Sequence, residues 1–179
     1  MNKVVIEGYV ESMDKALQKG VMAVRRNSGV TDYIPFKCSD TIEEESHVAL
    51  SGSLNTYNVI GEDGKRHKKM FVWGNVKDPT NSYENEVEFE GVICGKDVLR
   101  TTPQGRVIMD FVVAVNSGYH KSSYISCIVW SGSARHVNNL PIGTKVHVKG
   151  RFQSRDYSKG ENVLTAYEIS VSEIYSVDD

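Results

Sequence analysis

Arginine, lysine and aromatic side chains are concentrated in one stretch of the second half of the sequence. Residues 150–157 read Gly-Arg-Phe-Gln-Ser-Arg-Asp-Tyr, and basic and apolar residues alternate just before them. Because alternate residues of a β-strand share a face, this stretch predicts a strand with two different faces. One face carries Lys145, His147, Lys149 and Arg151, and the other carries Val146, Val148 and Phe152. Cations beside aromatic rings suit a ligand with phosphates and stackable bases, although an ordinary solvated amphipathic strand has the same alternation.

Neither metal binding nor catalysis is indicated by the spacing of the reactive side chains. Cys38, Cys94 and Cys127 are far apart and form no C-x-x-C pair, and the histidines show no paired ligand spacing. The strand-like surroundings of the cysteines favour buried thiols. A nuclease would need clustered carboxylates holding a metal beside an arginine, and no predicted face has such a group. We therefore expect no metal, no cofactor and no catalytic residues.

Charge is unevenly distributed along a chain whose composition is that of a globular protein. The 179 residues are 40% hydrophobic and 25% charged, and the formal net charge is −2, so overall charge indicates no polyanionic partner. Acidic residues are concentrated at 43–45 and 84–90 and basic residues at 65–69 and 145–155, which is compatible with a local positive surface. No apolar run approaches the ~18 residues of a membrane span and no signal-peptide pattern follows Met1, so we expect a cytoplasmic protein without membrane contact.

The order of features in the first half of the sequence recurs in the second half. Four residues of the first predicted strand recur 83 residues later: Asn2, Val4, Glu7 and Gly8 as Asn85, Val87, Glu90 and Gly91. Further along, Asp32-Tyr33-Ile34 is matched by Ser123-Tyr124-Ile125, and Gly52 by Gly150, at separations of 91 and 98 residues. Insertions in loops explain why the separation grows. The pattern predicts two similar domains.

Each half contains about five strand-like segments separated by glycine-rich turns. The Gly61–Gly64 segment predicts a hairpin whose returning arm carries the basic residues 65–69. The main candidate helix, Ser131 to Leu140, lies between the third and fourth strands of the second half, and the matching segment 40–46 predicts only a turn. Five strands with a helix at this position describe the oligonucleotide-binding (OB) barrel. We predict an all-β chain with two tandem five-stranded OB barrels at 1–77 and 85–177, joined by a linker at 78–84.

Aromatic residues in the second half have predicted positions outside the barrel core. In the strand containing residues 124–130, alternation places Tyr124 and Trp130 on the face opposite Ile125, Cys127 and Val129. Stacking on a base would give these exposed rings a role, whereas Trp130 could instead close the end of the barrel core. Tyr119 and Lys121 lie on a predicted hairpin and Arg100 in a predicted turn, where contact with solvent alone is the alternative.

The second half resembles the bacterial single-stranded DNA-binding protein family from Asn85 to Ile174. The resemblance is carried by four pieces in this order: residues 99–105 (Leu-Arg-Thr-Thr-Pro-Gln-Gly), 111–116 (Phe-Val-Val-Ala-Val-Asn), 124–130 (Tyr-Ile-Ser-Cys-Ile-Val-Trp) and 150–157. It implies that aromatic rings at the positions of Tyr119, Tyr124, Trp130 and Tyr157 stack on bases. It also implies phosphate contacts from Arg100, Lys121, Lys149, Arg151, Arg155 and Lys159.

The sequence differs from the family pattern in domain number and in its C-terminal segment. The resemblance implies one OB domain per chain and four per assembly, so a homodimer of this two-domain chain would restore four. The family's acidic, Phe-terminated tail is replaced by Tyr-Ser-Val-Asp-Asp at 175–179, so we do not expect replication or repair proteins to be recruited by that route.

The first half shares only the order of strands with this family. Its basic residues lie on the 65–69 arm, where Lys65, Arg66 and Lys68 precede Trp73. Either this domain binds DNA through the hairpin, or it is mainly an assembly surface.

We therefore expect a non-catalytic binder of single-stranded DNA with little sequence preference, acting in replication, recombination or repair. The alternative is an accessory factor of a replication or primosome complex whose OB domains bind mainly protein.

Overall fold

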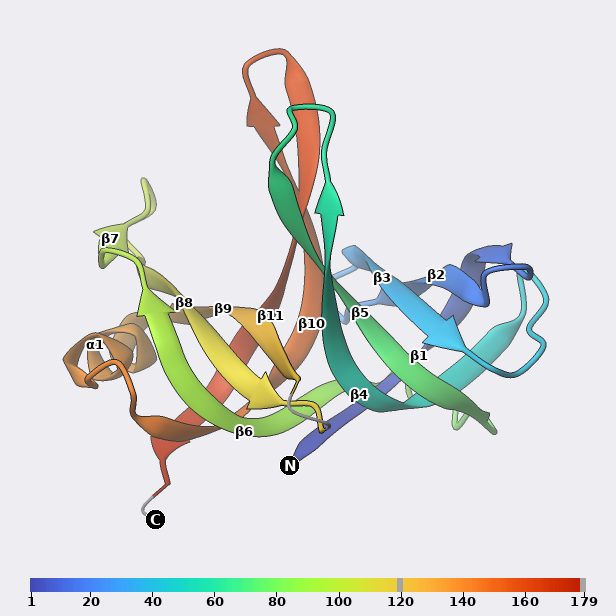
Figure 1. Ribbon diagram of the computed structural model, residues 1–179, viewed down its shortest axis with the longest axis horizontal. Coiled ribbons are helices and arrows are strands. Elements are labelled where there is room, and N and C mark those ends of the chain that lie inside the picture. The colour runs from blue at the N-terminus through green and yellow to red at the C-terminus, as the bar shows by residue number, and fades with distance from the viewer. Residues whose placement is uncertain (119–120, 178–179) are drawn as a thin grey trace.

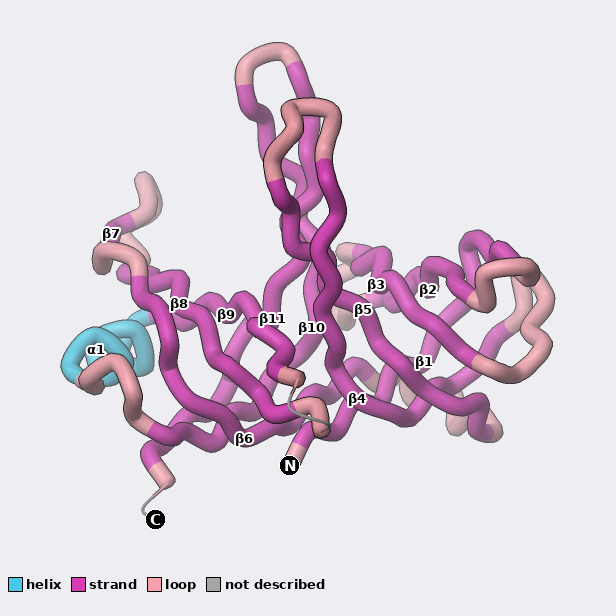
Figure 2. The backbone as a smooth tube through the Cα atoms, viewed as in Figure 1, coloured by secondary structure: helices cyan, strands magenta, loops and turns pink. Residues whose placement is uncertain are grey.

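The computed structural model describes residues 1–118 and 121–177, and within them the chain forms eleven strands and one helix. Five strands belong to the first half: β1 (Asn2–Asp14), β2 (Lys19–Arg25), β3 (Thr31–Cys38), β4 (His47–Ile60) and β5 (Arg66–Lys77). The second half contains β6 (Asn85–Lys96), β7 (Arg100–Thr101), β8 (Val107–Asn116), β9 (Ser122–Trp130), α1 (Ser131–Asn139), β10 (Lys145–Lys159) and β11 (Asn162–Ser176). Figure 2 shows that strands make up most of the described residues in both halves of the chain.

Each half closes into a five-stranded barrel, as predicted. In the first barrel, β1 pairs with both β2 and β4, and the parallel pair β3–β5 closes the ring at Phe36–Cys38 and Val72–Gly74. The second barrel closes in the same way through the parallel pair β9–β11 at Cys127–Ile128 and Ile169–Ser170. The two-residue strand β7 is an addition at the edge of β8. The fold is therefore a tandem of OB barrels.

The two barrels share one continuous sheet. β1 pairs antiparallel with β6 from Asn2 opposite Phe89 to Ile6 opposite Asn85. The first strands of the two repeats thus pair with each other, so the barrels lie side by side (Figure 1). The β4–β5 and β10–β11 hairpins project together from the line where the barrels meet (Figure 1).

Close backbone contacts explain the glycines of the sequence repeat. A Cβ atom on Gly8 would lie 2.2 Å from the carbonyl oxygen of Ala23, and one on Gly91 would lie 2.4 Å from that of Ala114. Gly52 and Gly150 meet neighbouring strands with the same closeness. Only glycine fits where another strand's backbone approaches so closely. The repeated glycines are therefore positions at which each barrel bends tightly.

The repeated asparagines fasten equivalent strands in the two barrels. Asn2 donates through Nδ2 to the Leu54 carbonyl and accepts from the Leu54 N–H, both at 2.9 Å. Asn85 makes the same pair of bonds with Phe152, at 2.8 and 2.9 Å. These bonds satisfy backbone groups that the local strand pairing leaves unpaired.

Apolar residues from alternate strand positions fill each barrel, with Phe36 and Leu50 in the first and Phe89 and Phe152 in the second among the fully buried side chains. The helix α1 follows β9 and precedes β10 in the chain, as predicted, and it packs against β8 and β9 with Ala134 and Val137 buried. Residues 40–46 of the first half contain turns and no helix, which also confirms the prediction.

One cysteine does not follow the sequence prediction. Cys38 and Cys127 are buried, but Cys94 is exposed, because it lies on the outer face of β6. None of the described residues form a cluster of histidine, cysteine and carboxylate side chains that could hold a metal ion. The described helix is also too short and too polar to cross a membrane.

Candidate nucleic-acid interface

A groove rich in arginine lies between the two barrels. It has a volume of about 880 Å³ and is bounded by the β2–β3 turn of the first barrel and by β10 and β11 of the second. We call it the junction groove. Its cationic side chains are Arg26, Arg106, Arg151 and Arg155, and its aromatic ones are Tyr33, Trp130 and Tyr167.

The buried carboxylate of Asp32 positions the first-barrel side of this groove. Arg26 donates to both oxygens of Asp32, through Nε at 2.7 Å and Nη2 at 2.6 Å. The same carboxylate accepts the backbone N–H of Ser154 on β10 at 2.9 Å, and the Ser154 hydroxyl accepts the N–H of Tyr33 at 2.8 Å. The β2–β3 turn is thus fixed to the second barrel, with Arg26 turned into the groove.

Polar contacts along β10 and β11 hold the other arginines in place. Gln153 accepts hydrogen bonds from Arg151 at 3.4 Å and from Arg26 at 3.5 Å, and it donates to Glu168 at 2.8 Å. Arg155 donates through Nε to the same Glu168 oxygen at 3.2 Å. Glu168 therefore compensates only part of the positive charge.

The pKa values of Arg26 and Arg151 are shifted in opposite directions because their neighbours differ. Burial and the nearby Arg26 guanidinium lower the pKa of Arg151, whereas the hydrogen bonds that Arg26 donates to Asp32 raise the pKa of Arg26. Both guanidinium groups stay charged at neutral pH. Crowded cations without full compensation favour a polyanionic ligand, and guanidinium groups match phosphate oxygens in geometry.

A second groove adjoins the first on the outer face of the second barrel. It has a volume of about 930 Å³, lies beneath the β4–β5 and β10–β11 hairpins, and shares Thr165 and Tyr167 with the junction groove. We call it the hairpin groove. Its basic side chains include Lys68 and Lys69 of the first barrel and Lys159 of the second, beside Tyr157.

The structure brings together about half of the site residues that the sequence predicts. Trp130, Arg151 and Arg155 meet in the junction groove. Lys68, Tyr157 and Lys159 meet in the hairpin groove, although Lys68 is far from the other two in sequence. Trp130 is partly exposed and outside the barrel core, so it does not close the core.

The predicted basic face of β10 is divided by its neighbours, which corrects one prediction. His147 is buried, with Nε2 3.0 Å from Glu88 and Nδ1 3.5 Å from Glu90, and Lys149 lies 3.4 Å from Glu88. These acids belong to β6, which pairs with this part of β10. His147 and the ammonium group of Lys149 therefore face carboxylates of the protein itself, and the basic wall of the groove begins at Arg151.

The remaining predicted residues lie outside the two grooves. Tyr124 and Trp73 are exposed at 49% and 45% on β9 and β5. Arg100 forms an ion pair with Asp110, and Lys65, Arg66 and Lys121 are exposed on turns or strand ends. Tyr119 lies outside the described residues.

Four arginine or aromatic residues of the junction groove are absent from the sequence-based set: Arg26, Tyr33, Arg106 and Tyr167. The repeat offered a signal for one of them, because Tyr33 is the counterpart of Tyr124. Arg26 and Arg106 carry no such signal, since only the packing of the barrels brings them to the groove.

The second barrel matches the sequence model of the Single-strand binding protein family over residues 84–177. The chain belongs to this family. Similar relatives include the single-stranded DNA-binding protein of Halalkalibacterium halodurans, 34% identical over an alignment of 84 residues that covers 43% of this chain and 50% of that protein. Single-stranded DNA-binding protein A of Bacillus subtilis is 35% identical over an alignment of 89 residues that covers 45% of this chain and 52% of that protein. The chain thus spans about half the length of the curated relatives it matches.

Likeness in fold extends over both barrels of this family member. The crystal structure of the wild-type single-stranded DNA binding protein from Thermus aquaticus aligns with a TM-score of 0.76, covering 100% of this chain and 94% of that one. Sequence identity in this alignment is 17%, so the likeness concerns the fold alone.

Proposed function

We propose that this chain binds single-stranded DNA without catalysis and with little sequence preference. The observation that carries the proposal is the junction groove, in which four arginines surround Tyr33, Trp130 and Tyr167. Arginines supply sequence-independent phosphate contacts, and aromatic rings stack on any base. Membership of the single-strand binding family and the names of the relatives support the same ligand. Replication, recombination and repair are the processes that expose such DNA.

Salt dependence of oligo-dT binding tests this proposal. Neutralising one phosphate of a single strand contributes a slope of about −0.7 to log affinity against log salt. Four arginine contacts therefore predict a slope of about −3. Filter binding over several salt concentrations measures this slope. Equal affinity for duplex and single-stranded DNA would refute the proposal, and capture of a replication protein with negligible DNA affinity would favour the protein-binding alternative.

We further propose that two chains associate as a homodimer with four barrels. Two barrels already lie side by side within one chain, so one further pairing gives four. Native mass spectrometry with and without a dT oligonucleotide tests this, with two chains per complex expected in both conditions and the mass of the bound oligonucleotide added in the second. A single-chain mass in both would contradict it.

The division into domains is also a proposal, with residues 1–77 and 85–177 as the two units and 78–84 as the linker. The family match to residues 84–177 supports the second boundary. Limited proteolysis tests the division, because a linker is cleaved before the barrels it joins.

A further inference from the structure

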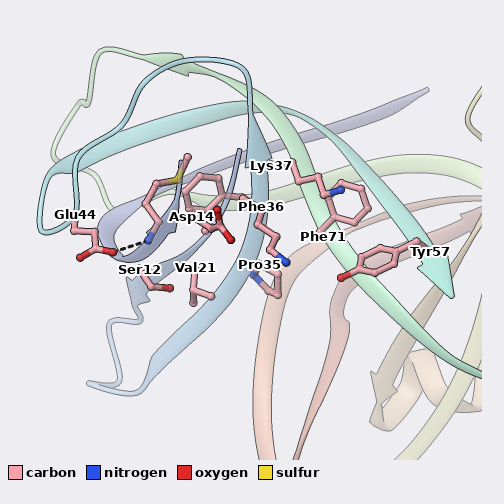
Figure 3. A pocket seen from close by; sticks show the side chains of 12 residues that line it. Ser12, Asp14, Val21, Pro35, Phe36, Lys37, Glu44, Tyr57 and Phe71 are labelled. Carbon is pink, nitrogen blue, oxygen red and sulfur yellow. Dashed lines mark hydrogen bonds between the residues drawn. The ribbon is translucent and has the colours of Figure 1, made fainter. Parts of the chain in front are cut away.

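The outer face of the first barrel has a pocket outside the two grooves. Its volume is about 560 Å³, and Tyr57 of β4 and Phe71 of β5 lie at one end of it. Figure 3 shows both rings on the same side as Pro35 and Lys37 of β3, with Glu44 at the far end. The rings of Tyr57 and Phe71 pack edge to face at 5.5 Å, and Tyr57 remains 45% exposed.

A lysine lies over both rings. The Nζ atom of Lys37 is 5.6 Å from the centre of the Tyr57 ring and 5.3 Å from that of Phe71, within the range of a cation–π contact. In the described part of the chain, no carboxylate lies within ion-pair distance of Lys37. A cation–π contact at an exposed site is weak, so a phosphate would be a stronger partner for this ammonium group.

The pocket lies beside surfaces that already carry positive charge and aromatic rings. Tyr33, Pro35 and Lys37 alternate along β3 and so share its outer face, and Tyr33 lines the junction groove. On the other side, Tyr57 pairs with Lys69, which lines the hairpin groove. A single strand of nucleic acid bound in either groove therefore needs only a short extension to reach the pocket.

Acidic side chains in this region are engaged with the local backbone. Glu44 accepts the N–H of Met13 at 2.9 Å, and Asp14 accepts the N–H of Leu17 at 3.0 Å. Negative charge at the Glu44 end repels phosphate, so the sugar-phosphate backbone of bound nucleic acid would run past Lys37. This leaves the aromatic end of the pocket for a base.

We propose that this pocket is a base-binding subsite for single-stranded nucleic acid in the first barrel. A base stacks on Tyr57 and Phe71, and Lys37 leaves the ring faces to contact the adjacent phosphate. This inference rests on the proposed function and adds the first barrel to the path of the strand. A peptide with an apolar side chain is the competing occupant, and continuity with the arginine and lysine surfaces favours nucleic acid.

A tryptophan placed in the pocket reports its occupancy directly. The chain has two tryptophans, Trp73 and Trp130, and replacing both by Phe gives a background without intrinsic tryptophan signal that keeps both rings. Tyr57→Trp in this background should be quenched by oligo-dT of about 35 nucleotides, longer than the span of two OB barrels of typical site size. Tyr9→Trp is the matched control, because Tyr9 is 49% exposed on β1 and lies outside the pocket.

The outcomes separate this inference from the proposed function. The subsite is supported if DNA quenches the tryptophan fluorescence of Tyr57→Trp and this quenching saturates at the same DNA-to-protein ratio as the anisotropy of labelled DNA. Normal DNA binding without quenching overturns the subsite, leaves the proposed function intact and assigns the pocket to another occupant. Absence of DNA binding by the unmodified chain refutes the proposed function itself.

Affinity gives an independent test. Tyr57→Leu with Phe71→Leu removes both rings and keeps apolar bulk. It should weaken binding of oligo-dT of about 35 nucleotides by about fivefold or more, the loss expected for one base stack. Unchanged affinity for this oligonucleotide, with an unchanged melting temperature, contradicts the subsite.

Discussion

Lys149 and Arg151 lie two positions apart on β10, yet their surroundings are opposite. Lys149 lies beside Glu88 of β6, whose hydrogen bond and charge raise the pKa of Lys149. Arg151 lies in the junction groove, where burial and Arg26 lower its pKa. A ligand phosphate must compete with a carboxylate at Lys149, whereas it relieves repulsion at Arg151. Individual side chains of one strand face therefore differ in what they contribute to binding.

Replacement of Trp130 should cost more DNA affinity than replacement of Lys149. Trp130→Ala removes a stacking ring and should cost about 1–3 kcal/mol of binding free energy, whereas Lys149→Ala should cost less because the amine already forms an ion pair with Glu88. Fluorescence anisotropy with labelled oligo-dT measures both. Trp130→Phe, which keeps a ring, is the control, and thermal melting shows whether the variants remain folded. A larger loss for Lys149→Ala would contradict the assignment.

At the scale of elements, the β2–β3 turn is the part of the first barrel that completes the junction groove. Its counterpart in the second barrel makes related contacts, since the Tyr124 N–H donates to the Thr56 hydroxyl at 3.2 Å and the Thr56 N–H to the Ser123 hydroxyl at 3.3 Å. Ser123 thus stands where Asp32 stands in the first barrel. The two barrels thus use equivalent positions for this contact, but Ser123 is neutral, whereas Asp32 is charged and accepts hydrogen bonds from Arg26.

Asp32→Asn should destabilise the protein more than Ser123→Ala. Loss of the carboxylate leaves the partly buried Arg26 without its counter-charge, and breaking such a buried pair costs about 3–5 kcal/mol, less here because the Arg26 side chain is 21% exposed. Ser123→Ala removes two neutral hydrogen bonds, with the Thr56 N–H and the Ser117 hydroxyl, at about 1–2 kcal/mol in total. Urea unfolding measures both free energies. Equal losses of unfolding free energy in the two variants would show that the charge of Asp32 does not stabilise the contact between the barrels.

The bend of β10 should depend on the absence of a side chain at position 150. In Gly150→Ala, the new Cβ would lie 2.3 Å from the Ser170 carbonyl oxygen, so the backbone must shift, at about 1–3 kcal/mol. Gly132→Ala is the control, because nothing lies within 4 Å of its Cβ position in α1 and alanine favours helices by about 1 kcal/mol. We expect opposite changes in the urea midpoint of the two variants. An unchanged urea midpoint in Gly150→Ala would show that β10 and β11 can move apart at this position at little cost in stability.

At the scale of the whole molecule, the connection between the barrels is fastened to the shared sheet by a buried carboxylate. Glu7 on β1 is fully buried and accepts hydrogen bonds from the backbone N–H and the hydroxyl of Thr80, at 3.0 and 2.9 Å. Burial, the largest single effect, would raise the pKa of Glu7. The hydrogen bonds from Thr80, together with the nearby His47, outweigh it and lower the pKa below its ordinary value of 4.5.

Stability should therefore fall in acid through Glu7. A carboxyl whose pKa is lowered by folding stabilises the native state above its unfolded pKa, and this contribution is lost as pH falls through the folded pKa. We expect the urea midpoint to decrease below about pH 4.5, and Glu7→Gln to reduce this decrease. Urea unfolding of both proteins at neutral and acidic pH measures it. The same acid dependence in Glu7→Gln would assign the effect to other carboxyl groups.

The sequence by itself determined the elements and their order. The repeated asparagines, glycines and alternating apolar residues report local requirements of each barrel, namely a fastened strand, a tight bend and a buried face, and each is visible within a few residues. The sequence predicted two OB barrels, a helix from Ser131 to Leu140 that the structure has at Ser131–Asn139, and the aromatic residues Trp130 and Tyr157 that line the two grooves. Tertiary structure alone decided which charges are available to a ligand. The pairing of β6 with β10 places Glu88 beside Lys149, and the packing of the barrels brings Arg26 to Arg151, because these neighbours come from strands far apart in the chain.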